Sequence, residues 1–172
     1  VSLTFSLLAQ TDAQPKLDAA NAAYTAGHLD SAMVLVDQVI TMAPDQAKAY
    51  KLRGDIHQRQ KDFDAAMADY KTSEKLDNKD PRLFISRCAL LITKGNFKGG
   101  LQEADKALDL DPNDADAWYD RSCALYLEGD GDAALKSANK AMQLRPDYAE
   151  AIYLTGVIEG EQNDEEAGLA HI

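Results

Sequence analysis

A repeat of 34 residues is the feature that most limits how this chain can fold. Four similar segments recur at that spacing: MAPDQAKAY from residue 42, LDNKDPRLF from 76, LDPNDADAW from 110 and LRPDYAEAI from 144. Aligning the chain on them gives full repeats at 13–46, 47–80, 81–114 and 115–148, and a partial repeat at 149–161. A period of this length is typical of stacked supersecondary structures that bury their apolar faces only against neighbours.

Two columns of the repeat hold small residues throughout. The eighth column contains Ala20, Gly54, Cys88, Ser122 and Gly156, and the twentieth contains Ala32, Ala66, Gly100 and Ala134. Small residues at fixed points on two successive helices let the two backbones approach closely, as they must in a helical hairpin. The spacing therefore predicts two antiparallel helices in each repeat.

Other columns predict where these helices end and begin. The fifteenth column holds Gly27, Lys61, Gly95 and Gly129, where a positive φ is expected at a helix end. Asp62, Asn96 and Asp130 follow three of these residues. Column 32 reads Pro44, Asn78, Pro112 and Pro146, and proline cannot continue a helix. The fourth column carries the bulky residues Tyr50, Phe84, Trp118 and Ile152.

This combination of period and columns resembles the tetratricopeptide repeat, over residues 13–161. The resemblance implies an all-α fold, a right-handed α-solenoid of antiparallel helix pairs, which is the superhelix typical of that family. It also implies that the first helix of each pair lines a concave groove. Within this scheme the domain spans residues 14–161, an apolar segment at 1–13 precedes it, and an acidic tail at 162–172 follows a last helix that ends near residue 161.

The acidic stretch LDLDPNDADAWYDR at 108–121 invites comparison with a calcium loop, because Asp109, Asp111 and Asn113 stand at its first, third and fifth positions. The required glycine is replaced by Asp114, and Asp120 stands where a bidentate glutamate belongs. Helix capping explains the acidity better, since anionic side chains are favoured at a helix N-terminus. No metal site and no cofactor are expected.

Charge and residue content exclude several functions. The net charge of -11 argues against binding nucleic acid or an anionic bilayer, because phosphate recognition needs clustered cations. His28, His57 and His171 are scattered, and no nucleophile elbow or phosphate-binding loop is present. Cys88 and Cys123 are too few for a disulfide framework. The sequence therefore predicts a protein that is not an enzyme.

The first nine residues, VSLTFSLLA, are apolar and uncharged. They fit the end of a secretory signal, which favours a periplasmic or exported protein over a cytoplasmic one, although no basic region precedes them. Their alternation also suits a short strand, or an arm that docks on a neighbouring copy and makes a homo-oligomer. No segment is long enough to predict insertion into a membrane.

The resemblance also implies which residues face the groove, namely columns 2, 5, 6, 9, 12 and 13 of each first helix. The residues predicted to bind a partner are Asn21, Tyr24, Lys48, Lys51, Asp55, Arg59, Arg82, Ile85, Ile92, Tyr119, Tyr126 and Tyr153. The cations among them would form one patch beside an apolar, aromatic one. That surface suits a partner protein or peptide with an acidic segment and apolar anchors. The alternative is that some of the tyrosines pack between repeats.

Two narrower interpretations concern charged columns. Some family members resemble chaperone cofactors with a carboxylate clamp, but the matching positions here include Leu17, Leu52 and Ser86, so that clamp is not expected. Column seven holds Arg53, Arg87 and Arg121, which we expect to pack with buried stems and to pair with nearby acids.

The leading hypothesis is a non-enzymatic scaffold that binds a partner peptide or helix in its groove. Self-assembly through residues 1–13 is a second hypothesis, and an accessory domain of a larger complex is a third.

Overall fold

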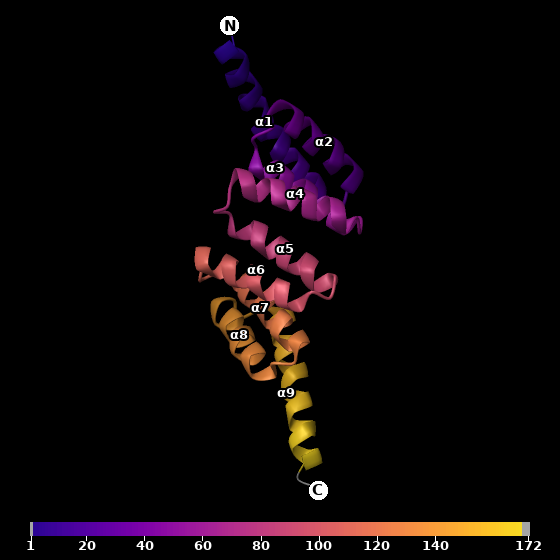
Figure 1. The fold of residues 1–172 in the computed structure, drawn as a ribbon, viewed down its shortest axis with the longest axis vertical. Coiled ribbons are helices and arrows are strands. Elements are labelled where there is room, and N and C mark those ends of the chain that lie inside the picture. Colours follow the sequence, from indigo (N-terminus) through magenta and orange to yellow (C-terminus); the bar gives the residue numbers. More distant parts are fainter. Residues whose placement is uncertain (1, 170–172) are drawn as a thin grey trace. The chain divides into compact units, whose positions relative to one another are not determined.

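The structure is a computed structural model that describes the backbone of residues 2–169 and the side chains of residues 12–163. All of its described elements are helices: α1 (Ser2–Thr25), α2 (Leu29–Met42), α3 (Ala47–Arg59), α4 (Phe63–Leu76), α5 (Pro81–Thr93), α6 (Phe97–Leu110), α7 (Ala115–Glu128), α8 (Gly131–Leu144) and α9 (Ala149–Leu169) (Figure 1). The chain is thus an all-α solenoid of helix pairs, one pair in each full repeat.

Two compact units make up the chain. The N-terminal unit spans residues 1–79 and contains α1 to α4, and the C-terminal unit spans 80–172 and contains α5 to α9. Within the N-terminal unit a core of Ala20, Val36, Val39 and Ile56 joins α1, α2 and α3. Within the C-terminal unit, Leu125 of α7, Ala134 of α8 and Ile158 of α9 form a similar three-helix contact. Within each unit, neighbouring repeats therefore share a common core.

The small columns mark the points where paired helices approach most closely. A Cβ atom added to Gly54 on α3 would lie 2.5 Å from Cε1 of Tyr70 on α4. Tyr70 is fully buried, and its hydroxyl lies 2.8 Å from a carboxylate oxygen of Asp55. The ring therefore fills the space that a side chain at position 54 would need.

The turn inside each pair has the conformation that the sequence predicts. Gly27, Lys61, Gly95 and Gly129 have φ values of 81°, 64°, 76° and 90°. The side chains of Asp62, Asn96 and Asp130 then cap α4, α6 and α8 by accepting a backbone N–H from the third residue on. The α2 helix begins after His28, whose side chain makes no such bond. A left-handed residue followed by a cap thus separates the paired helices in three of the four turns.

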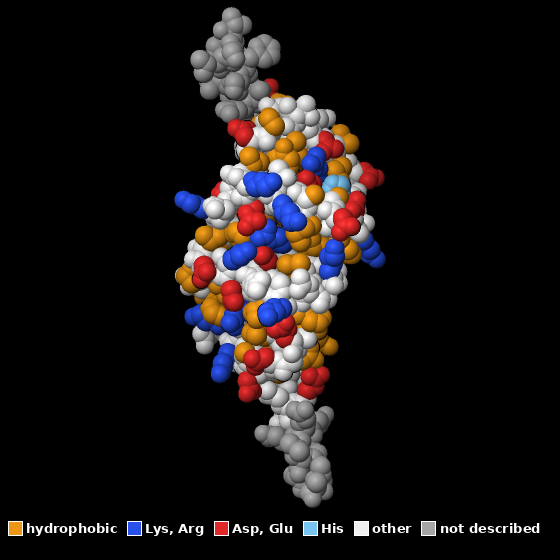
Figure 2. Space-filling model, viewed as in Figure 1, with side chains coloured by type: hydrophobic (Ala, Val, Ile, Leu, Met, Phe, Trp, Pro, Cys, Tyr) orange, Lys and Arg blue, Asp and Glu red, His pale blue; other side chains and the backbone are white. Residues whose placement is uncertain are grey.

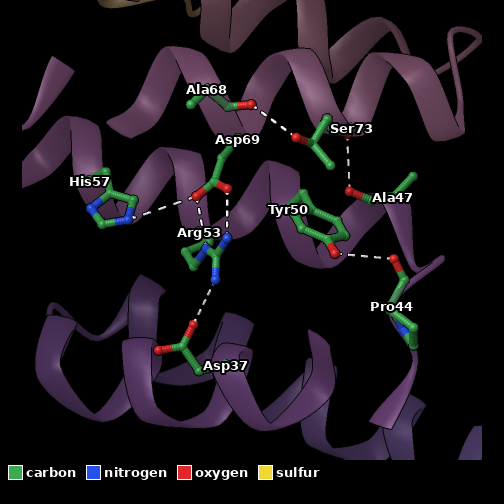
Figure 3. Close-up of polar contacts among 10 residues, drawn as sticks. Asp37, Pro44, Ala47, Tyr50, Arg53, His57, Ala68, Asp69 and Ser73 are labelled. Atoms are coloured by element: carbon green, nitrogen blue, oxygen red, sulfur yellow. Dashed lines mark hydrogen bonds and ion pairs between the residues drawn. The ribbon is translucent and has the colours of Figure 1, made fainter. Parts of the chain in front are cut away.

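Bulky residues of the fourth column fix the turn between repeats. The Tyr50 hydroxyl donates a hydrogen bond to the Pro44 carbonyl oxygen at 3.1 Å (Figure 3). The Trp118 indole nitrogen donates in the same way to the Pro112 carbonyl oxygen at 2.9 Å. Both bonds connect a first helix to the turn that precedes it, so these two aromatic residues stabilise the turns between repeats.

The arginine column forms ion pairs, as predicted. Arg53 binds both carboxylate oxygens of Asp69 at 2.8 Å and reaches Asp37 at 2.9 Å, and so connects α2, α3 and α4 (Figure 3). Nε of Arg87 donates to Glu103 at 2.7 Å, and Nε of Arg121 donates to Asp105 at 2.8 Å. These guanidinium groups are engaged in packing helices and leave no basic stripe.

The ends of the chain differ from the sequence-based predictions. Because α1 begins at Ser2, the alternative of a short strand there is wrong. Because α9 continues to Leu169, the last helix does not end near residue 161, and the acidic residues that follow are helical. The side chains of residues 1–11 and 164–172 lie outside the described part of the chain, so the signal segment and the docking arm stay predictions. Among the described residues no helix is long and apolar enough to cross a membrane.

Candidate functional site

In the N-terminal unit, Tyr24 and Arg59 come together from α1 and α3. The Arg59 guanidinium lies 3.9 Å from the centre of the Tyr24 ring, and its Nη1 donates to the Tyr24 carbonyl oxygen at 3.0 Å. Burial raises the pKa of Tyr24, and the charge of Asp55 adds to that rise while Arg59 opposes it. The contact holds a cation and an aromatic face side by side at two predicted groove positions.

Some of the other predicted binding residues of this unit already form hydrogen bonds or ion pairs within the protein. Lys51 donates to Asp55 at 2.7 Å within α3, so that lysine is already paired. Asn21 on α1 donates to the Leu17 carbonyl oxygen at 3.0 Å. Lys48 is exposed, and no described carboxylate lies within ion-pair distance of Lys48 or Arg59. Among the predicted cations of this unit, these two therefore have no carboxylate partner in the described part of the chain.

Arg82, the fourth cation predicted for the patch, belongs to the C-terminal unit. It donates to Asp116 Oδ2 at 2.8 Å and lies 3.6 Å from Asp114. Arg145 and the Tyr148 hydroxyl both donate to the other Asp116 oxygen at 2.9 Å. Burial of Asp116 would raise its pKa, but these three hydrogen bonds outweigh burial, so its pKa is lowered. Arg82 is thus part of a structural network centred on Asp116.

Three tyrosines predicted to bind a partner lie on α7 and α9, and their side chains differ in exposure and in contacts within the protein. Tyr119 packs against Tyr148 with ring centres 5.1 Å apart. Tyr126 donates its hydroxyl to Glu161 at 2.8 Å, which joins α7 to α9. Tyr153 is 76% exposed. The alternative of packing within the protein therefore applies in part to Tyr119 and Tyr126, whereas the Tyr153 side chain is largely exposed.

The two predicted isoleucines on α5 are both half-buried. Ile85 packs on the cluster formed by Phe84, Ala107 and Ala117. Ile92 lies over Gly100 of α6, where an added Cβ would stand 2.9 Å from its Cγ1. Both residues therefore contribute to the core as well as to the first-helix surface.

A pocket of about 560 Å³ opens beside Tyr126 where α7, α8 and α9 meet. Its lining includes Glu128, Asp130, Asp132, Ile158, Glu161 and Gln162. Gly131 also lines it, at the column where the earlier repeats have Leu29, Phe63 and Phe97. The missing side chain at position 131 leaves this space open, because bulk there would point toward Ile158 and Gln162.

Sequence reasoning missed Asp120, which stands at the sixth column of α7 and so at a predicted groove position. Burial, with the nearby charges of Asp116 and Asp114, raises its pKa to about 7. The column number alone could have identified the position. Its raised pKa could not be foreseen, because burial, the largest cause, depends on how the helices pack.

The face that Figure 2 shows carries charged side chains of both signs. On the face that Figure 2 shows, Lys and Arg side chains alternate with Asp and Glu across the described residues. The structure brings Tyr24 to Arg59 and Lys51 to Asp55, but Arg82 lies in the other compact unit. No group of three metal-ligating side chains gathers within the part of the chain that the structure describes.

Comparison with known proteins identifies the family. The tetratricopeptide repeat model matches residues 17–81 and 90–149, which is most of the chain. The chain belongs to the tetratricopeptide repeat family. Proteins of this family are generally non-enzymatic interaction modules. No curated protein matches the chain in sequence.

Solved structures of tetratricopeptide repeat proteins share the fold at low sequence identity. YrrB, a repeat protein with an unusual peptide-binding site, is 23% identical with a TM-score of 0.69, over 91% of this chain and 81% of that one. The pilF protein of Pseudomonas aeruginosa is 12% identical with a TM-score of 0.84, over 91% of this chain and 71% of that one. The first repeat domain of Spaghetti (RPAP3), bound to the HSP90 peptide SRMEEVD, is 20% identical with a TM-score of 0.67, over 69% of this chain and 94% of that one.

Proposed function

We propose that the protein is a non-enzymatic scaffold that binds an extended segment of a partner protein along the first helices of its repeats. The observation that carries this proposal is the exposure of Tyr153, at 76%, on a first helix. A large aromatic side chain left open on a protein surface is a typical anchor for a binding partner. Tyr119 occupies the same column on α7, Tyr126 occupies another column predicted to face the groove, and both would extend the aromatic surface.

Two cations of the N-terminal unit favour a partner segment that contains acidic residues. Lys48 is exposed, and Arg59 presents its charge over the Tyr24 ring without a carboxylate partner among the described residues. A carboxylate of the partner could therefore pair with either cation without displacing an internal ion pair. We accordingly propose a partner segment with acidic residues and apolar anchors.

Other members of the family support peptide binding in general. YrrB has a peptide-binding site, and the Spaghetti domain holds a peptide of HSP90. A chaperone C-terminus is not the partner proposed here, because Leu17 and Leu52 occupy clamp positions and are buried at 1% and 3% exposure. Two apolar side chains in the core cannot hydrogen-bond a terminal carboxylate.

Selection of displayed random peptides on the intact chain tests this proposal. The parent should enrich a peptide motif, and the double variant Tyr119→Ala, Tyr153→Ala should bind the selected peptides at least about tenfold more weakly. Because Tyr119 packs on Tyr148, the variant's thermal unfolding is measured beside its binding. A matched control removes exposed apolar residues from second helices, Val34→Ala with Leu110→Ala, and should bind as the parent does. Equal binding by the tyrosine variant would exclude this surface.

A second candidate function is self-assembly, and the length of α1 favours it. This helix has 24 residues, while the first helices α3, α5 and α7 have 13 or 14. The extra turns precede the first repeat and would supply a docking arm. Deleting residues 1–13 should then abolish any oligomer seen by light scattering, and an unchanged mass for an oligomeric parent would exclude the arm.

A further inference from the structure

The pocket beside Tyr126 lies where the fourth repeat lacks a bulky side chain. Gly131 is the first residue of α8, and the three earlier repeats have a large apolar residue at that column. A Cβ atom added to Gly131 would lie 3.5 Å from Cγ2 of Ile158 and 3.1 Å from Nε2 of Gln162. The cavity of about 560 Å³ thus includes space that a side chain at position 131 would enter. Its volume is within the range of pockets that bind ligands.

Part of the pocket lining is apolar and fixed by the core. Ile158 lines the pocket, is only 1% exposed, and belongs to the core cluster of the C-terminal unit. Tyr126 also lines the pocket and packs against the same cluster. The pocket therefore offers a preformed apolar wall against which a methylene chain can lie.

The rest of the lining is rich in carboxylates, which come from α7, the turn after it, α8 and α9: Glu128, Asp130, Asp132 and Glu161. The Tyr126 hydroxyl donates to Oε1 of Glu161 at 2.8 Å, and Nε2 of Gln162 donates to Oδ1 of Asp132 at 3.0 Å. Among the described side chains, Glu161 and Asp132 form no other hydrogen bond. Neutral donors thus hold these two carboxylates in place and leave one oxygen of each for a further donor.

The charge of the pocket is not balanced from within. No Lys, Arg or His lines it, and its four carboxylates form no ion pair with any side chain that the structure describes. A metal ion needs several ligands that converge on one point, and no group of three metal-ligating side chains gathers within the described residues. Separated carboxylates beside an apolar wall suit a larger organic cation better than a metal ion.

Two residues of the pocket stand at columns predicted to face the groove. Tyr126 is in the twelfth column, on α7. Glu161 is in the thirteenth column, on α9, where the second repeat has Arg59. A segment that binds along α7 and α9 can therefore place one of its side chains in the pocket.

We propose that this pocket is a subsite for one arginine side chain of the bound partner segment. The methylene stem would lie against Ile158 and the Tyr126 ring, in the space that Gly131 leaves open. The guanidinium carries five N–H donors in a planar fork, so it can bind carboxylates of α8 and α9 at once. The proposal rests on the proposed function and adds a basic residue to the segment, apart from the acidic residues that Lys48 and Arg59 favour.

NMR titration of the intact chain with N-acetyl-arginine amide tests the subsite without any partner segment. Backbone amide resonances of residues 128–132 and 158–162 should shift, with a Kd of about 1 mM at low salt. N-acetyl-citrulline amide has nearly the same shape without the charge and should bind at least about tenfold more weakly. Calcium chloride is the third ligand and should leave these resonances unchanged.

Three variants place the binding in the pocket. Gly131→Leu restores the bulk of the earlier repeats and should weaken binding of the arginine amide at least about tenfold, because it fills the space needed by the stem. Its thermal midpoint should not fall, since leucine favours a helix more than glycine does and the Gln162 side chain can move aside. Glu161→Gln keeps the shape and should weaken binding about fivefold. The control Glu159→Gln makes the same charge change on α9 outside the lining and should bind as the parent does.

Several results would overturn the subsite. These are no shift of the named resonances at about 20 mM arginine amide, equal binding of the citrulline amide, or unchanged binding by Gly131→Leu. Equal shifts with calcium would assign the pocket to a metal ion instead. None of these results bears on the proposed function, which fails separately if Tyr119→Ala with Tyr153→Ala binds the selected peptides as the parent does.

Discussion

Gly54 and Gly156 occupy the same column of the repeat but have different surroundings. An added Cβ at Gly54 would lie 2.5 Å from the buried ring of Tyr70, whereas one at Gly156 would meet nothing within 4 Å. Gly54→Ala should therefore lower the free energy of unfolding by about 1–3 kcal/mol through overpacking. Gly156→Ala should raise it by about 0.5–1 kcal/mol, because alanine favours a helix. Urea unfolding of both variants checks the pair, and effects of the same sign would contradict it.

Buried and exposed arginines of the seventh column should also differ. The side chains of Arg87 and Glu103 are 7% and 10% exposed, while those of Arg121 and Asp105 are 28% and 51% exposed. Arg87→Ala leaves the buried Glu103 carboxylate without Arg87, beside the half-exposed Lys106, and should cost about 3 kcal/mol.

Arg121→Ala provides the matched comparison and should cost no more than about 1 kcal/mol, since water screens an exposed pair. Replacing Arg87 and Glu103 together by leucine should cost less than Arg87→Ala alone, because the buried Glu103 carboxylate is then removed with its arginine. Chemical unfolding measures all three variants, and a cost for Arg87→Ala no larger than that for Arg121→Ala would be inconsistent with this account.

At the scale of the elements, one turn departs from the pattern of the others. Lys61 adopts a φ of 64°, where the equivalent positions have glycine. A side chain in the left-handed region costs roughly 1 kcal/mol. Lys61→Gly should therefore stabilise the chain by about that amount, and thermal unfolding should show a higher midpoint. Gly95→Ala is the converse change and should destabilise it; a stabilising effect would disprove the reasoning.

The element boundaries show how far sequence reasoning reaches. Turn residues such as Gly95 and Asn96, and paired small residues such as Gly54, were predictable because each repeat confirms the next. The end of α9 was not predictable in this way, because no following repeat marks it. Its Gly156, Gly160 and acidic run suggested an early end, but glutamate and glutamine favour helix, and the backbone continues to Leu169.

The sequence could place the predicted binding residues on the first helices, but it could not predict their environments. The columns placed Tyr24 and Arg59 on facing first helices, where they do meet. They could not show that Ile92 packs over Gly100, or that Asp116 takes up Arg82. Such pairings depend on side chains from several elements, which one repeat pattern does not specify.

For the molecule as a whole, Asp120 should make stability depend on pH. Its pKa is raised to about 7 in the folded protein, above the ordinary value of 3.8, so the folded state binds more protons between these values. The contribution of Asp120 to stability therefore falls as the pH rises from about 4 to about 7. The pKa of Asp116 is lowered from its ordinary value of 3.8, so its contribution to stability changes in the opposite sense. That contribution is lost as the pH falls below about 4.

Asp120→Asn should remove this penalty. The thermal midpoint of the variant relative to the parent should rise as the pH increases from about 5 to about 8, because only the parent must then ionise a partly buried carboxyl. Asp109→Asn, on the surface of α6, should show no such trend. A difference between Asp120→Asn and the parent that stays constant across this range would contradict the assignment.

The most direct test of the scaffold itself is affinity capture from an extract of the source cells with three forms of the intact chain. These are the parent, Tyr119→Ala with Tyr153→Ala, and the control Val34→Ala with Leu110→Ala, with mass spectrometry of the retained proteins. The account predicts a protein held by the parent and the control but lost by the tyrosine variant while that variant remains folded. Retention of the same proteins by all three forms would contradict binding at the first helices.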